Sequence, residues 1–414
     1  MEKFSLSNGL TVMVEEMPYL RSASIGVWVK AGSMLETAEE NGLSHLMEHM
    51  AFKGTKKRTA RQIAEEMDMI GGMMNASTSK LCTNYYCKVI DEDLPKAADI
   101  LADIVCDPAI EQAELDKERS VVLEEIAMVE DSPEDVVFDV LAEATFVDQP
   151  LGRTILGPAE QIEKYSSEDL FRFRSRHYGP ENAVIAIAGN VKMGQVKQLL
   201  EDKFGFWQGA KGSDFPACTA VDKKRNLFRN KDTEQVHLAL SYRGLKLGSG
   251  DVYAMALMNT VFGGGMASRL FQKIREEMGM AYSVYSGPSN YPGCGEFTVY
   301  AATSPKHVEK VMRQIEEEAR LLVEKGITEK EFVQAKAHIK GGFILGLESA
   351  YSRMSSMGHN QILLGRYIDP EDTIGAIDRV TPEDVKQIAE KILTGPVCSA
   401  VVGKNAEKYT KRIL

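Results

Sequence analysis

Residues 45–49 read His-Leu-Met-Glu-His, and the interpretation of the whole chain starts from this stretch. On a helix of 3.6 residues per turn, His45 and His49 lie about 40° apart, and Glu48 lies about 60° from His45 on the other side. One helix face therefore offers two imidazoles to a metal ion and one carboxylate to a water molecule on that metal. Zinc accepts imidazole nitrogen and keeps a position open for water in hydrolytic sites. It lowers the pKa of that water to about 7, and Glu48 can then take its proton during attack on a carbonyl.

The order of the motif is H-x-x-E-H, the reverse of H-E-x-x-H, and the reversed form marks its own group of metallopeptidases. The alternative is a surface helix that carries two solvated histidines. With only 7 His in 414 residues, the motif arises by chance on the order of once per hundred such sequences. The stretch therefore predicts a zinc hydrolase.

The bulk composition describes a soluble, acidic protein. A chain of 414 residues exceeds one compact core and predicts two domains of roughly 200 residues each. The net charge of −11 argues against nucleic acid as a partner, because no basic excess is available for phosphates. The N-terminus has no apolar signal core, and no apolar run reaches the length of a membrane span. We expect a cytoplasmic location without a membrane partner.

Cysteine usage fits a reducing compartment. The six cysteines are scattered and none forms C-x-x-C, so neither a zinc ribbon nor a thioredoxin-type pair is indicated. In a chain of this size we expect buried free thiols rather than disulfides. These residues are Cys82, Cys87, Cys106, Cys218, Cys294 and Cys398.

Helical and strand patterns mix without strict β-α-β alternation, which predicts an α+β fold. A hairpin is predicted over 4–14, with Asn8-Gly9 as its turn. Asn41 and Ser44 are candidate caps of the helix that carries the motif. Further strands are predicted at 23–30, 73–79, 84–90 and 183–188, and helices at 61–70, 94–105, 111–129, 133–145 and 171–177.

A faint internal repeat supports two domains. Residues 205–222 are rich in Gly, Ser and Pro and form the best linker candidate. Beyond it, the strand pattern 236–242 resembles 24–29, and the helical stretch 252–262 stands where the motif helix stood. We predict an N-terminal zinc-binding domain, 1–210, and a similar C-terminal domain without metal ligands, 222–414.

The third zinc ligand is sought in the acidic helix predicted at 111–129. Glu118 and Glu125 are seven residues apart, so they lie on one stripe of the helix. They are separated by about 10 Å along the helix axis. Only one of them can bind the metal, and the other can hold a ligand histidine by its second nitrogen. Spacing alone does not choose between the two. The remaining histidines have no metal-like neighbours and are expected to be ordinary polar or core residues; they are His177, His237, His307, His338 and His359.

Three segments together, HLMEHMAFKGT, GGMMNA and ERSVVLEEI, resemble the pitrilysin and mitochondrial processing peptidase family of zinc peptidases. The likeness runs over essentially the whole chain and is greatest to bacterial single-chain members of processing-peptidase size. In that family the third ligand is the second glutamate of an E-x6-E pair about 76 positions after the last histidine. The resemblance thus assigns His45, His49 and Glu125 to zinc, Glu48 to the general base and Glu118 to support of a ligand.

The resemblance also implies a fold and a mode of substrate binding. Each domain would be a roughly six-stranded antiparallel sheet with helices packed on one side. Substrate peptide would add as a strand to the edge formed by 71–78, where Asn75 and Ala76 stand at the family's N-A position. Without the family, Asn75 would be read simply as a residue at the start of a strand.

In the second domain, the segment FGGGMASRLFQKIREEMGMAYSVYSG at 262–287 resembles the family's glycine-rich loop and the R-x6-Y element after it. The resemblance gives Gly263, Gly264 and Gly265 to substrate binding, and Arg275 and Tyr282 to the substrate carbonyl and its oxyanion. Because this chain is half the length of the fused family members, we infer that Arg275 and Tyr282 act on the zinc site of a partner subunit in a homodimer. The alternatives are a helix salt bridge for the arginine and a strand aromatic for the tyrosine.

The sequence thus predicts a zinc metalloendopeptidase that cleaves peptides or short unfolded segments inside a dimer chamber, with zinc-bound water as nucleophile. Zn2+ follows from two histidines and one carboxylate, although cobalt or manganese could substitute. The alternative is a non-catalytic scaffold or a heterodimer partner in a processing-peptidase-like complex. The intact H-x-x-E-H and E-x6-E pair speak against a scaffold.

Overall fold

The computed structural model describes residues 1–220 and 223–410 and divides them into two compact units. Unit 1 comprises 1–126, 154–216 and 344–368, and unit 2 comprises 127–153, 217–343 and 369–414. Each unit is therefore discontinuous in sequence: segment 127–153 belongs to unit 2, and segment 344–368 belongs to unit 1. Each unit is built on one mixed sheet with its own hydrophobic core.

The sheet of unit 1 has six strands. The predicted hairpin pairs antiparallel, with Glu2 opposite Val14. The second hairpin strand then runs parallel to the strand at 183–189, and the other neighbours are antiparallel. In spatial order the strands are β1 (Glu2–Ser5), β2 (Thr11–Glu16), β6 (Ala183–Gly189), β3 (Ser22–Val29), β5 (Thr83–Ile90) and β4 (Met73–Thr78).

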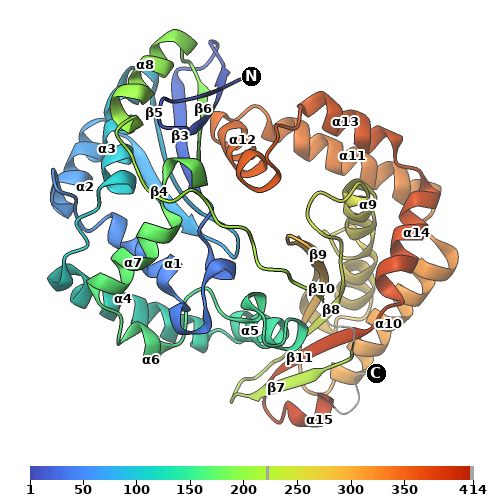
Figure 1. The fold of residues 1–414 in the computed structure, drawn as a ribbon. Helices are drawn as coiled ribbons and strands as arrows, with labels where there is room; N and C mark the ends of the chain where they lie inside the picture. The colour runs from blue at the N-terminus through green and yellow to red at the C-terminus, as the bar shows by residue number, and fades with distance from the viewer. Residues whose placement is uncertain (221–222, 411–414) are drawn as a thin grey trace. The chain divides into compact units, whose positions relative to one another are not determined.

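Helices cover both faces of this sheet, because side chains alternate along each strand. Val27 and Ile185 face the larger core, and Trp28 and Ala186 face the smaller one. The larger core takes α1 (Leu43–Ala51), α2 (Ala60–Met69), α3 (Leu94–Cys106), α4 (Gln112–Asp131), α6 (Ala159–Ile162), α7 (Ser167–His177) and α8 (Met193–Phe204). The smaller core packs against α12 (Ala350–Leu364), which is orange in Figure 1 and belongs to the second half of the chain.

Unit 2 repeats this plan with five described strands. Their spatial order is β7 (Asn226–Asn230), β11 (Val397–Gly403), β8 (Val236–Arg243), β10 (Gly295–Thr303) and β9 (Ala281–Asn290). Only the first pair is parallel among them.

One face of this second sheet packs against α9 (Val252–Phe262), α10 (Val308–Lys325) and α14 (Pro382–Leu393). The other face packs against α5 (Pro133–Thr145), a helix from the first half of the chain. The remaining helices are α11 (Glu329–Gly346), α13 (Pro370–Arg379) and α15 (Glu407–Thr410).

The α+β class and the two similar sheets are confirmed. Three details differ from the expectation: each sheet contains one parallel pair, the second has five described strands, and a helix covers part of the second face of each. The helix is needed because large side chains such as Trp28 point to that face and are buried there, at 2% exposure. No helix in the described ranges is long and apolar enough to cross a membrane.

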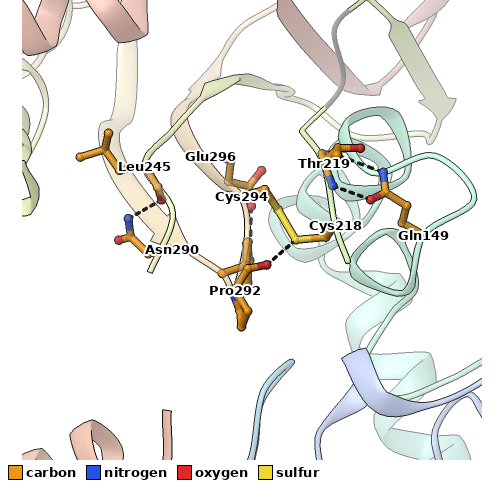
Figure 2. Close-up of a disulfide and its surroundings, with 9 residues drawn as sticks. Gln149, Cys218, Thr219, Leu245, Asn290, Pro292, Cys294 and Glu296 are labelled. Carbon is orange, nitrogen blue, oxygen red and sulfur yellow. Dashed lines mark hydrogen bonds between the residues drawn. A yellow bond between two sulfur atoms is a disulfide. The ribbon is translucent and has the colours of Figure 1, made fainter. Parts of the chain in front are cut away.

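One pair of cysteines contradicts the expectation of free thiols. Cys218 and Cys294 form a disulfide, although they are 76 positions apart. Figure 2 shows the bond beside Thr219, whose N–H and carbonyl pair with the Gln149 side chain at 2.9 and 3.0 Å. Sequence spacing could not reveal the pair, because it forms only where the β9–β10 connection meets the linker. The other four cysteines are free and buried, as expected.

Candidate metal centre

A buried carboxylate fixes the start of the motif helix α1. Gly42 precedes the helix with a left-handed backbone, φ +101°. Glu36 accepts the N–H groups of Gly42 and Ser44 at 3.0 and 2.7 Å, and the Asn41 amide at 3.1 Å. The expectation that the Asn41 or Ser44 side chain caps the helix is therefore wrong, since an acid from outside the helix takes that role. The helix dipole favours its negative charge, whereas burial raises the pKa of Glu36.

Three side chains converge beside α1, two from the helix itself and one from α4. His45 Nε2 lies 3.2 Å from His49 Nε2, and Glu125 Oε2 lies 3.6 and 3.5 Å from those two nitrogens. A tetrahedral zinc with bonds of about 2.0–2.1 Å has ligand–ligand edges of about 3.4 Å. The donor set of two imidazoles and one carboxylate therefore fits zinc in both type and spacing. Within the described residues this is the one group of His, Cys, Asp or Glu side chains that can hold a metal.

Glu118 settles the orientation of His49. Its Oε1 lies 2.9 Å from His49 Nδ1, so this nitrogen donates and Nε2 keeps its lone pair for the cluster. Both glutamates lie on α4, whose stripe Leu115, Glu118 and Val122 is buried. The neighbouring Val121 is 51% exposed, because it lies off that stripe on the helix surface.

His45 differs from His49 in its surroundings. Its Nδ1 is buried and has no hydrogen-bond partner among the described residues. Burial, and secondly the nearby His49, lowers the pKa of His45 to about 4. The imidazole is therefore neutral at physiological pH, which is the form that binds a metal.

Glu48 lies on α1 beside this centre, and its carboxylate is held by a residue of the strand β4. The Thr78 hydroxyl, at the end of β4, donates a hydrogen bond to Glu48 Oε2. Burial raises the pKa of Glu48, while the bond from Thr78 and the charge of His49 lower it. A carboxylate with a raised pKa close to two histidines suits a general base.

Two of the residues expected to bind substrate, Asn75 and Ala76, lie on β4, which ends the sheet of unit 1. The strand pairs with β5 on one side only among the described strands, and its side chains alternate between exposed and half-buried. Asn75 is exposed and its Oδ1 accepts the N–H of Ala76 at 2.9 Å. The free edge offers backbone groups that can pair with an extended peptide.

Unit 2 holds the other candidate residues. The glycines 263–265 follow α9, and Gly263 lies so close to β9 that a Cβ would stand 2.5 Å from Ser286 Oγ. Arg275 sits on a π-helical segment, Phe271–Glu277, with its guanidinium 4.9 Å from the Tyr282 ring centre and 4.7 Å from that of Phe271. The structure thus pairs the arginine with the tyrosine, a residue that is 75% exposed.

Three residues around the centre escape sequence reasoning: Glu36, Lys53 and Thr78. Lys53 Nζ lies 2.6 Å from Glu118 Oε2. Its position four residues after His49 is the one local signal of this contact. Glu36 and Thr78 are separated from their partners by loops or strands, so no spacing in the sequence indicates them.

Comparison with known proteins gives a consistent picture. Residues 11–159 match the model of the insulinase family, peptidase family M16, and residues 164–339 match that of the peptidase M16 inactive domain. The chain is 40% identical to an uncharacterized zinc protease of Bacillus subtilis, over 97% of this chain and 98% of the relative. It is 37% identical to one of Streptomyces coelicolor, over 99% of this chain and 91% of the relative.

Solved structures share the fold. A protease from Helicobacter pylori superimposes with a TM-score of 0.91 at 23% identity, covering 97% of this chain and 98% of the other. A peptidase M16 inactive domain from Pseudomonas fluorescens gives the same TM-score at 20% identity, covering 98% of both chains.

Proposed function

Because the chain belongs to peptidase family M16, we propose that it is a zinc-dependent metalloendopeptidase that hydrolyses peptides or short unfolded segments. The observation that carries the proposal is the cluster of His45, His49 and Glu125, whose donor atoms all lie within 4.8 Å of one another. The relatives in Bacillus subtilis and Streptomyces coelicolor are named zinc proteases, which supports the choice of metal.

These three side chains would hold the ion, with Glu118 keeping His49 in the tautomer that binds. A zinc ion held by these residues would supply Lewis-acid activation of a water molecule and of the substrate carbonyl. Glu48 accepts the proton of the attacking water and passes it to the leaving amine. Thr78 holds the Glu48 carboxylate in place during both transfers.

Substrate recognition is proposed to rest on the β4 edge. A peptide would pair with its backbone near Asn75 and Ala76, a mode with little dependence on side-chain sequence. The glycines 263–265 would allow close approach of a peptide backbone. We further propose a homodimer in which Arg275 and Tyr282 stabilise the oxyanion at the partner's zinc site, with cleavage inside a chamber formed by the two subunits. A cytoplasmic location belongs to the same proposal.

Peptide hydrolysis by purified protein tests this function. The wild type and Glu48→Gln are loaded with equal zinc and given a mixed library of unstructured peptides. We expect cleavage by the wild type, its loss on chelation and its return with zinc. Glu48→Gln should retain zinc but lose at least 100-fold in rate, because general-base catalysis contributes about 10²–10⁴-fold.

Glu124→Gln is the matched control, since Glu124 is exposed on α4 beside the ligand Glu125. It removes a carboxylate from the same helix without touching the cluster, so full activity is expected. A zinc-loaded wild type that cleaves no peptide would contradict the proposal and favour a heterodimer partner or scaffold.

A further inference from the structure

Lys53 makes the second contact of the carboxylate that orients His49. Its Nζ lies 2.6 Å from Glu118 Oε2, while Glu118 Oε1 lies 2.9 Å from His49 Nδ1. Each oxygen of the Glu118 carboxylate therefore has one donor, and the two donors, His49 and Lys53, are four residues apart in the chain. The side chain of Glu118 is only 6% exposed, whereas that of Lys53 is 31% exposed. The partly exposed Lys53 side chain thus contacts a carboxylate that is buried.

The contact is specific within a basic loop. Lys53 is followed by Lys56 and Lys57, which pair elsewhere: Lys56 with Asp107 at 2.7 Å, and Lys57 with Asp103 at 3.8 Å. Among the ion pairs of the described residues, Lys53 is the one lysine that reaches Glu118. Lys53 lies two residues beyond the end of α1 at Ala51, and its side chain reaches back to the carboxylate that His49 contacts.

A buried carboxylate that accepts a hydrogen bond from a single donor has no fixed orientation. It can rotate about its last bond, and its second oxygen loses hydration without gaining a partner. An ammonium on Oε2 removes both problems, since it fixes the plane of the carboxylate and leaves Oε1 directed at His49 Nδ1. The lone pair of His49 Nε2 then points at the cluster before any metal arrives.

We infer that Lys53 is a positioning residue of the metal centre, which strengthens zinc binding by locking Glu118 onto His49. The inference rests on the proposed zinc site. It adds Lys53 to the contacts that orient His49, and Lys53 is neither a metal ligand nor the base. Partners of ligand histidines typically change metal affinity by about 10–100-fold when removed. For loss of Lys53 we expect about 10-fold, because Glu118 itself stays.

The test measures zinc affinity directly, by competition with a chromogenic chelator at pH 7.5, and needs no catalytic assay. Lys53→Met should weaken zinc binding about 10-fold. Lys53→Arg, which can still place a cation on Glu118, should restore most of it. Lys56→Met is the matched control from the same loop and should bind zinc like the wild type. Far-UV circular dichroism of the zinc-free proteins reports whether each variant is folded.

A double-mutant cycle tests whether Lys53 acts through Glu118. Glu118→Gln removes the charge through which Lys53 acts, so adding Lys53→Met in that background should weaken zinc binding no further. If Lys53→Met binds zinc as tightly as the wild type, the inferred role of Lys53 is overturned, while the proposed zinc site is unaffected. An equal loss with and without Glu118 also overturns that role. A wild type that binds no zinc at all overturns this inference together with the proposed function.

Discussion

At the scale of single residues, Glu48, the proposed general base, accepts a hydrogen bond whose effect on its pKa opposes that of burial. Burial raises the pKa of Glu48, and the hydroxyl of Thr78 acts in the other direction by donating to the carboxylate. The same bond ties Glu48 to β4, the strand whose edge is proposed to receive the peptide. The proposed peptide-binding edge and the contact that holds Glu48 therefore lie on one strand.

Replacing Thr78 by valine removes this hydroxyl while keeping the shape of the side chain. A hydrogen bond to a charged group contributes about 1.5–3 kcal/mol. We expect Thr78→Val to lower kcat about 10-fold or more, with zinc content and KM little changed. Steady-state kinetics on one peptide, with metal analysis of the same samples, provides the measurement.

Ser77→Ala is the control on the same strand, because the Ser77 hydroxyl bonds Asn84 on the neighbouring strand instead of Glu48. It should keep kcat within about twofold of wild type. A Thr78→Val protein with wild-type kcat would show that Glu48 needs no support from β4.

At the scale of elements, the packing of α12 on the first sheet depends on a glycine. Gly358 lies against the Trp28 ring, and a Cβ at this position would stand 2.2 Å from Trp28 Cε3. Trp28 belongs to β3 and is buried in the core that α12 completes. The close approach of helix and strand thus exists because position 358 has no side chain.

Gly358→Ala should therefore destabilise the protein, by about 1–3 kcal/mol, as overpacking of a filled core does. Gly342→Ala serves as the comparison. This glycine lies on α11, where an added Cβ would meet nothing within 4 Å, and alanine there should stabilise by about 0.5–1 kcal/mol through helix propensity. Urea unfolding of the two variants measures both effects. Equal changes in midpoint would contradict the packing argument.

At the scale of the whole molecule, the proposed homodimer predicts complementation between two inactive variants. Glu48→Gln lacks the base and Arg275→Ala lacks the oxyanion contact. In a mixed dimer, one site combines the intact zinc centre of one subunit with the intact arginine of the other. Random mixing at equal amounts should then restore about a quarter of wild-type activity.

The measurement is peptidase activity after the two proteins have been mixed and allowed to exchange subunits. Each variant mixed with itself is the control and should stay inactive. If Arg275 acted within its own chain, both sites of the mixed dimer would lack one group, and no activity would return.

The features that the sequence predicts well are local ones. A helix fixes the positions of His45, Glu48 and His49 relative to one another, because residues three and four apart share a face. Strand alternation and turn residues likewise indicate β1 to β6 and the hairpin at Asn8-Gly9, since each depends on neighbours within a few positions. Spacing narrows the third ligand to Glu118 or Glu125, and the family resemblance then selects Glu125.

The remaining features depend on contacts between distant segments, which no local pattern encodes. The tertiary structure alone brings Glu36 to the start of α1, Thr78 to Glu48, and Cys218 to Cys294. It also places α5 and α12 on sheets built from the opposite half of the chain. Such contacts are decided when the helices and strands, once formed, bury their remaining apolar surfaces against one another. The sequence by itself thus determines the chemistry offered to a metal, and the packing of the folded chain decides which side chains hold that chemistry in place.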